Sequence, residues 1–287
     1  MSPVMLDQTP GVVTVTRASI RSGGHPRTLP RSRRLARIAI GAACAGALLS
    51  VPCRLLAQEA VPTSGGGRQE TPEGGRTSGL ETSFGASLTF ASAFVWRGFV
   101  LGSDPALQPS VWAEIGPVTI SSWSNTYVPS AGGMRYSEHD FSVDYSREVR
   151  GLTISAGWIN YTFPREASGR HTNEFYAAVG TGGYLAPKFQ VYHDVNEGKG
   201  TYAMLSVAHE YPLTPGGVTI EPAVSLGYNH HQWTERTGFS DLTTVVTATL
   251  PTPIKRLSLQ PFVGYSCGFD AATFPRRFYG GLTLAVE

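Results

Sequence analysis

The sequence predicts an all-β protein, a transmembrane antiparallel β-barrel of about twelve strands. Three observations support this prediction: short segments with a two-residue apolar period, tight turns that alternate with longer loops, and an export signal near the N-terminus. The period is clearest where polar or small residues separate Val218, Ile220, Pro222, Val224, Leu226 and Tyr228. One face of such a strand is apolar, and in an exported chain the repeated pattern is typical of a membrane β-barrel.

The N-terminal region has the features of a targeting segment. Its longest apolar stretch, residues 38–51, follows a group of arginines from Arg31 onwards and precedes small residues near Ala57. No run of 18 apolar residues occurs, which excludes a helical membrane span. We therefore expect an N-terminal extension and a secretory signal peptide over residues 1–57. A single-span anchor is the alternative, and the short length and Pro52 disfavour it.

Removal of the signal changes the charge of the chain. Residues 1–57 contain eight of the 23 basic residues and one of the 21 acidic residues, so the remainder has a net charge of −5. The basic residues therefore give no indication of a nucleic-acid partner. Cys44 and Cys53 leave with the signal, so Cys267 alone remains and no intrachain disulfide is expected.

Residues 58–82 are rich in Gly, Pro, Thr and Glu and predict a flexible leader, whereas residues 83–287 predict the barrel. The first strand is expected at 83–97, with Phe84 and Phe90 on its apolar face. The same alternation predicts eleven further strands, at 107–115, 118–120, 140–145, 152–158, 175–179, 185–191, 203–207, 218–228, 242–250, 257–265 and 282–286.

The connections support an even number of strands. Those after even-numbered strands are short, as at Gly116–Pro117 and Arg150–Gly151, and those after odd-numbered strands are mostly longer, as at 129–136 and 268–276. Short periplasmic turns that alternate with longer outer loops are the layout of outer-membrane barrels. Proline removes a ladder hydrogen bond, so local bulges near the periplasmic rim are expected beside Pro109, Pro187, Pro222 and Pro261.

Aromatic residues gather near the strand ends that meet the longer loops: Phe94, Trp96, Trp123, Tyr127, Trp158, Tyr161, Phe163, Tyr192, Tyr228 and Tyr265. Amphipathic rings settle at the level of the lipid headgroups, so we expect an aromatic girdle. A soluble β-sandwich, which also alternates, is the alternative. It would need a coherent inner core, whereas these strands place many charges on their second face.

The polar face of the strands gives the candidate pore-lining residues, which are Arg97, Gln108, Glu114, Asp140, Asp144, Glu174, Lys188, Gln190 and Asp194. The same face carries Glu210, Glu221 and Asp241, so eight acids accompany two bases. Carboxylates around a lumen favour cations. A barrel of this size holds either a narrow water-filled channel or an interior filled by side chains, and both alternatives stay open. Arg97 is expected to pair with Gln108 or Glu114 on the neighbouring strand, or to set selectivity.

No group of residues predicts catalysis. His139 and Ser142 are three positions apart, which places them on opposite faces of a strand, and His230 and His231 have no carboxylate or cysteine at ligand spacing. No glycine-rich phosphate loop or zinc pattern occurs. We therefore expect no enzymatic activity, catalytic residue, cofactor or metal, with a barrel lipid hydrolase as the third-ranked alternative.

Several motifs resemble one family of outer-membrane proteins. The segments Phe94-Val95-Trp96-Arg97-Gly98, Pro105-Ala106-Leu107-Gln108 and Trp123-Ser124-Asn125 are similar to the aromatic-x-Arg-Gly, Pro-Ala-x-Gln and Trp-x-Ser-Asn elements of the TorF-type porins, the Gcw_chp group. The resemblance spans residue 83 to the C-terminus and implies an outer-membrane barrel of porin type. The chain departs from many such barrels at its end, where Glu287 stands in place of Phe or Trp.

Together these inferences predict a Gram-negative outer-membrane protein that passes small hydrophilic solutes or ions by passive diffusion, with a preference for cations. Its expected partners are outer-membrane lipid, the permeating solutes or ions, and the barrel-assembly machinery. The second hypothesis is a non-conducting structural or scaffolding barrel that resembles the MipA family.

Overall fold

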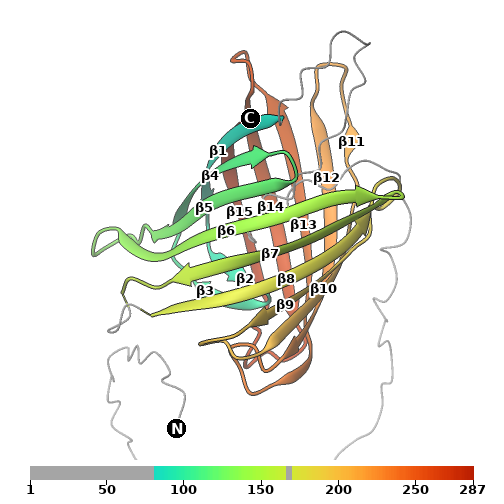
Figure 1. Ribbon diagram of the computed structural model, residues 1–287. Coiled ribbons are helices and arrows are strands. Elements are labelled where there is room, and N and C mark those ends of the chain that lie inside the picture. Colours follow the sequence, from blue (N-terminus) through green and yellow to red (C-terminus); the bar gives the residue numbers. More distant parts are fainter. Residues whose placement is uncertain (1–80, 166–169) are drawn as a thin grey trace, which may run out of the picture. The chain divides into compact units, whose positions relative to one another are not determined.

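The computed structural model describes residues 81–165 and 170–287 (Figure 1). The predicted signal peptide over 1–57 and nearly all of the predicted leader over 58–82 lie outside these residues. The described part of the chain contains no helix that is long and apolar enough to cross a membrane.

Twelve strands close into one antiparallel barrel, as the sequence predicts. In chain order the strands of the described residues are β1 (Thr82–Ala91), β2 (Phe94–Trp96), β3 (Phe99–Gly102), β4 (Ala106–Ile115), β5 (Val118–Tyr127), β6 (Arg135–Val149), β7 (Leu152–Thr162), β8 (His171–Thr181), β9 (Lys188–Asp194), β10 (Thr201–Ala208), β11 (Tyr211–Pro212), β12 (Thr219–His230), β13 (Thr237–Pro251), β14 (Leu257–Gly268) and β15 (Arg277–Val286). The barrel runs from β1 through β4–β10 and β12–β15, and β15 pairs back with β1. The short β11 extends the pairing of β12, and β2 pairs with β3 in a separate sheet.

Side chains of each strand point alternately into and out of the barrel, because successive Cβ atoms lie on opposite faces. In β6, Glu138, Asp140 and Asp144 are buried, whereas Phe141 and Tyr145 are 40 % and 47 % exposed. Other strands also expose large apolar side chains, among them Phe84, Val111, Ile154, Phe175, Phe189, Leu205, Val263 and Leu282. The barrel therefore has an apolar outer surface around a polar interior.

The connections follow the predicted alternation in length over part of the barrel, but residues 182–187 between β8 and β9 form a connection as long as that of residues 231–236. Gly116–Pro117 joins β4 to β5, and Arg150–Gly151 joins β6 to β7. At the opposite ends of the strands, residues 128–134, 231–236 and 269–276 join β5 to β6, β12 to β13 and β14 to β15. The turn at positions 150 and 151 has φ angles of 54° and 79°, which suit a two-residue hairpin of type I′.

The predicted bulges do not occur beside these prolines in the described strands, where the ladder is interrupted but its register does not shift. The β4–β5 pairing is interrupted beside Pro109 and the β13–β14 pairing beside Pro261, because proline has no N–H to donate. Opposite Pro222, the strand that faces β12 breaks between β10 and β11, and Pro187 lies immediately before β9. Pro187, Pro222 and Pro261 lie near the strand ends where the sequence places the periplasmic rim. Pro109 does not, because it lies near the long-loop end of β4.

The first strand ends earlier than predicted. β1 stops at Ala91, which pairs with Ala106 of β4, and residues 93–104 leave the barrel wall. Instead of a strand end and an outer loop, they form the hairpin of β2 and β3. The apolar alternation from Phe84 is interrupted once, at Ser92, which follows the last residue of β1, and Phe94 and Trp96 restore the same period beyond it.

Candidate functional site

The hairpin of β2 and β3, residues 94–102, lies inside the barrel and is the candidate functional site. On one side, Val95 belongs to a buried cluster with Val245, Phe262 and Tyr279, which project from β13, β14 and β15. On the other side, the tip of the hairpin contacts residues of β8, β9 and β10. A segment that touches inward side chains on both sides of a closed barrel crosses its lumen.

Arg97 and Gly98 form the two-residue turn at the tip of the hairpin. Their φ angles are 48° and 82°, so both lie in the left-handed region that a type I′ turn requires. At Gly98 a Cβ atom would lie 2.8 Å from the Cβ of Asp241 on β13, so both the conformation and the close approach favour glycine. Arg97 adopts this conformation at a cost of about 1–2 kcal/mol, which its side-chain contacts must offset.

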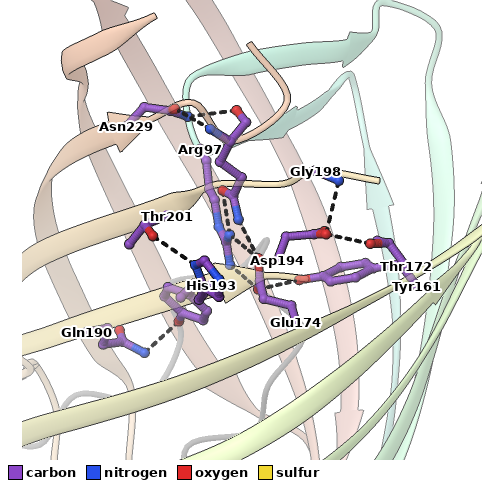
Figure 2. A network of polar contacts seen from close by, with 12 residues as sticks. Arg97, Tyr161, Thr172, Glu174, Gln190, His193, Asp194, Gly198, Thr201 and Asn229 are labelled. Atoms are coloured by element: carbon purple, nitrogen blue, oxygen red, sulfur yellow. Dashed lines mark hydrogen bonds and ion pairs between the residues drawn. The ribbon is translucent and has the colours of Figure 1, made fainter. Parts of the chain in front are cut away.

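The guanidinium of Arg97 forms a bidentate ion pair with Glu174 of β8 (Figure 2). Nη1 and Nη2 donate to Oε2 and Oε1 of Glu174 at 2.7 and 2.8 Å, and the two side chains are 1 % and 0 % exposed. Nη1 also donates to Oε1 of Gln232 at 2.9 Å. Paired charge-assisted hydrogen bonds of this geometry are strong, and loss of either partner would leave a buried charge.

Neutral groups complete the hydrogen bonding of Glu174. The hydroxyl of Tyr161 donates to Oε1 at 3.0 Å, and the side-chain amide of Gln232 donates to Oε2 at 2.5 Å. Gln232 is positioned by Asn229, which accepts from its backbone N–H at 2.9 Å and donates to its carbonyl at 3.1 Å. Each oxygen of the Glu174 carboxylate therefore accepts two hydrogen bonds from protein groups.

Three aromatic rings surround the guanidinium. The Cζ atom of Arg97 lies 4.0 Å from the ring centre of Tyr192, 4.5 Å from that of Trp96 and 4.9 Å from that of Tyr202. A cation over an aromatic face is stabilised electrostatically, and more so where water is excluded. The tip of the hairpin is thus held by one carboxylate and by rings from two neighbouring strands.

The prediction of an outer aromatic girdle is wrong for most of its members. Phe94, Trp96, Trp123, Tyr161 and Tyr192 lie inside the barrel. Phe163 packs against the same interior cluster as Trp96, and the ring of Tyr127 lies against Gly102 of the hairpin. By contrast, Tyr228 and Tyr265 face outward, each 40 % exposed. The odd or even position along a strand could have separated the inward rings from the outward ones. In β7, for example, Tyr161 lies two positions after the buried Ile159 and so on the same inward face, whereas Trp158 lies on the other face.

Asp194 organises the loop between β9 and β10. Its Oδ1 accepts from the hydroxyl of Thr172 at 2.6 Å and from the backbone N–H of Gly198 at 3.0 Å (Figure 2). It also accepts from the backbone N–H of Asn196 at 2.9 Å. These bonds fold the loop back toward β8. Asp194, a candidate pore-lining residue, therefore has a structural role, because its hydrogen bonds hold this loop.

The expected partners of Arg97 on the neighbouring strand are wrong. Gln108 donates instead to Asn125 of β5 at 3.0 Å, and Glu114 accepts from Ser83 of β1 at 2.9 Å. The physical reason is that Arg97 does not continue the barrel wall. The turn carries it across the lumen to β8, where Glu174 lies.

The remaining candidates lie on the inward face of the strands, as parity predicts. Asp144 is buried and accepts from the hydroxyl of Tyr176 at 2.6 Å. Gln190 is buried and donates to the hydroxyl of Tyr192 at 2.7 Å. Lys188 is half-buried at the start of β9.

Sequence reasoning missed Gln232, Tyr202 and Glu138. Gln232 lies in a connection between strands, where no period assigns a direction to a side chain. Glu138 has the parity of Asp140 and could have been found, but β6 begins five residues before the strand that the sequence predicts.

The interior of the barrel is acidic. Its buried carboxylates are Glu138, Asp140, Asp144, Glu174, Asp194, Glu221 and Asp241, whereas Arg97 is the one buried arginine or lysine of the described residues. No group of three or more His, Cys, Asp and Glu among residues 81–165 and 170–287 is placed to hold a metal ion.

Comparison with known proteins identifies no relative. No family model matches the chain, and no curated protein sequence matches it. The resemblance to the TorF-type porins stays a prediction, and the function has to be inferred from the barrel and the hairpin inside it.

Proposed function

We propose that the chain is an outer-membrane channel of porin type, in which the β2–β3 hairpin narrows the lumen. Small hydrophilic solutes or ions would cross it by passive diffusion, with cations preferred. Outer-membrane lipid and the barrel-assembly machinery are its partners in this proposal, as they are for the TorF-type porins that its motifs resemble.

The observation that carries the proposal is the combination of a closed barrel, an apolar outer face and an acidic interior crossed by one hairpin. An apolar outer face suits lipid, because a closed ladder leaves no backbone group unpaired in the hydrocarbon. An acidic interior suits cations. A segment folded into the lumen sets the width of the passage.

The direct experiment measures single-channel conductance of the refolded chain, from about residue 58, in a planar bilayer with a salt gradient. The same measurement is made on a hairpin-deleted variant, in which Asn-Gly replaces residues 93–104. This short connection is feasible because Ala91 of β1 and Ala106 of β4 are paired neighbours. We expect the wild type to conduct weakly and the variant to conduct several-fold more. Both should show a cation-selective reversal potential.

The control removes Gly132 and Gly133 from the β5–β6 loop, where added Cβ atoms would meet nothing within 4 Å. Because residues 130–134 of this loop are exposed, its shortening should leave the conductance unchanged. A folded hairpin-deleted barrel that stayed silent would contradict the channel proposal. Anion selectivity would keep the channel and contradict the charge argument.

A non-conducting scaffold is the second candidate, and one observation favours it. The side chains around the tip of the hairpin are almost fully buried, with Glu174 and Gln232 at 0 % and Tyr192 and Tyr202 at 1 % exposure. Side chains therefore fill the interior at this level. The conductance of the wild type, compared with that of the hairpin-deleted variant, separates the two candidates.

A further inference from the structure

Two buried carboxylates on β6 lack a counter-charge. Glu138 and Asp140 are two positions apart, so both project from the inward face of the strand, and each residue is 8 % exposed. The Oδ1 atom of Asp140 is enclosed and has no hydrogen-bond partner in the structure. None of the ion pairs between described residues includes either carboxylate.

Asp140 lies beneath the β2–β3 hairpin. The strand register places Trp123 of β5 on one side of it and Tyr161 of β7 on the other. The ring of Phe94 packs on Trp123 with centres 5.5 Å apart, and the ring of Trp96 packs on Tyr161 at 6.1 Å. The hairpin therefore covers both neighbours of Asp140 and separates this carboxylate from the water of the lumen.

The surrounding charges do not neutralise the pair. The charged groups that act on Asp140 are the carboxylates of Glu138 and Glu174, which have the same sign. Glu174 is neutralised by Arg97. The nearest arginine along β6, Arg135, forms an ion pair with Asp104 in the connection before β4. Neither carboxyl group thus has a basic partner in an ion pair of the described residues.

A carboxyl group in such a place either takes up a proton and is neutral, or is ionised beside a cation that balances its charge. The structure provides such a cation for Glu174 by bringing in the guanidinium of Arg97. For Glu138 and Asp140 a single divalent cation would balance both charges. Hard cations prefer carboxylate oxygens, and Ca²⁺ accepts irregular coordination.

We propose that Glu138 and Asp140 form a binding site for a divalent cation on the inner wall of the barrel, beneath the hairpin. This site does not require that the barrel conducts. Two carboxylates are fewer than the ligands of a dedicated high-affinity site, so we expect a Kd of about 10⁻⁴–10⁻³ M for Ca²⁺.

The test is equilibrium dialysis of the refolded chain against radiolabelled Ca²⁺ near neutral pH. We expect Glu138→Gln and Asp140→Asn each to weaken Ca²⁺ binding by at least about tenfold. The matched control is Asp144→Asn, on the same face of the same strand. That carboxylate already accepts a hydrogen bond from Tyr176, and its replacement should leave Ca²⁺ binding intact.

Heat-modifiable mobility on gels confirms that each variant has folded. The proposal is overturned if the folded wild type binds no Ca²⁺, or if Asp144→Asn weakens binding as much as Asp140→Asn does. Because no current is measured, a silent barrel that binds Ca²⁺ supports the site and contradicts only the channel. A conducting barrel that binds none contradicts only the site.

Discussion

The ion pair at the tip of the hairpin gives the sharpest stability prediction. Arg97→Met leaves the carboxylate of Glu174 in a fully buried place with neutral donors alone, and Glu174→Met leaves the guanidinium with one amide oxygen and aromatic rings. Breaking a buried pair from one side costs about 3–5 kcal/mol, because the remaining charge is unpaired. The double variant removes both charges, so its cost should fall below the sum of the single costs by about 2–3 kcal/mol.

The assay is urea unfolding of the refolded barrel in lipid vesicles, followed by tryptophan fluorescence for the wild type, both single variants and the double variant. The matched control is the ion pair of Arg236 with Asp270, which has a similar N–O distance of 3.0 Å but side chains that are 56 % and 22 % exposed. Solvent screens that pair, so its coupling should be much smaller. Equal coupling in the two cycles would refute the role assigned to the buried pair.

Three further predictions concern a glycine, a tyrosine and a loop aspartate. Gly98→Ala should lower the free energy of unfolding by about 1–2 kcal/mol more than Gly132→Ala does. Both glycines have positive φ angles, 82° and 90°, but only at Gly98 would the added Cβ meet neighbouring atoms. Equal urea midpoints for the two variants would contradict this prediction. Tyr176→Phe removes the hydrogen bond to Asp144 and should cost about 1–3 kcal/mol in the same assay, and an unchanged midpoint would be contrary evidence. A hydrogen bond from the side chain of Thr273 is the main cause that holds the pKa of Asp270 below its ordinary value. The ionised carboxylate therefore stabilises the folded loop above about pH 4, and this stabilisation is lost as the pH falls through the lowered pKa of the folded state. Acid-dependent cleavage of this loop by pepsin should therefore increase with falling pH in the wild type but not in Asp270→Asn.

The barrel itself could be predicted because its determinants are local. A two-residue period assigns a direction to every side chain of a strand, so the inward positions of Gln108, Asp144 and Gln190 follow from their neighbours in the sequence. The two-residue turns at positions 116–117 and 150–151 then indicate which consecutive strands are antiparallel neighbours.

The hairpin could not be predicted by the same means, because its determinants are distant in the sequence. The pair of Arg97 with Glu174 spans 77 residues, and that with Gln232 spans 135. A single polar residue, Ser92, interrupts the apolar period of residues 84–96, and one such residue does not distinguish a continuous membrane strand from a strand followed by a hairpin. The two structures differ in the surroundings of Phe94. In the closed barrel its ring packs on that of Trp123, which is distant in the sequence.

Two separate sets of contacts hold the hairpin in the lumen. Val95 packs in an apolar cluster against β13–β15, and this contact depends on burial rather than on charge. The tip depends on one ion pair and on rings from β9 and β10. Because Arg97 stores backbone strain in its left-handed conformation, loss of the ion pair removes the contact that offsets this strain while the apolar side stays in place. The tip is therefore the part of the hairpin that a change of charge inside the lumen can release, and the side beside Val95 is the part that anchors it.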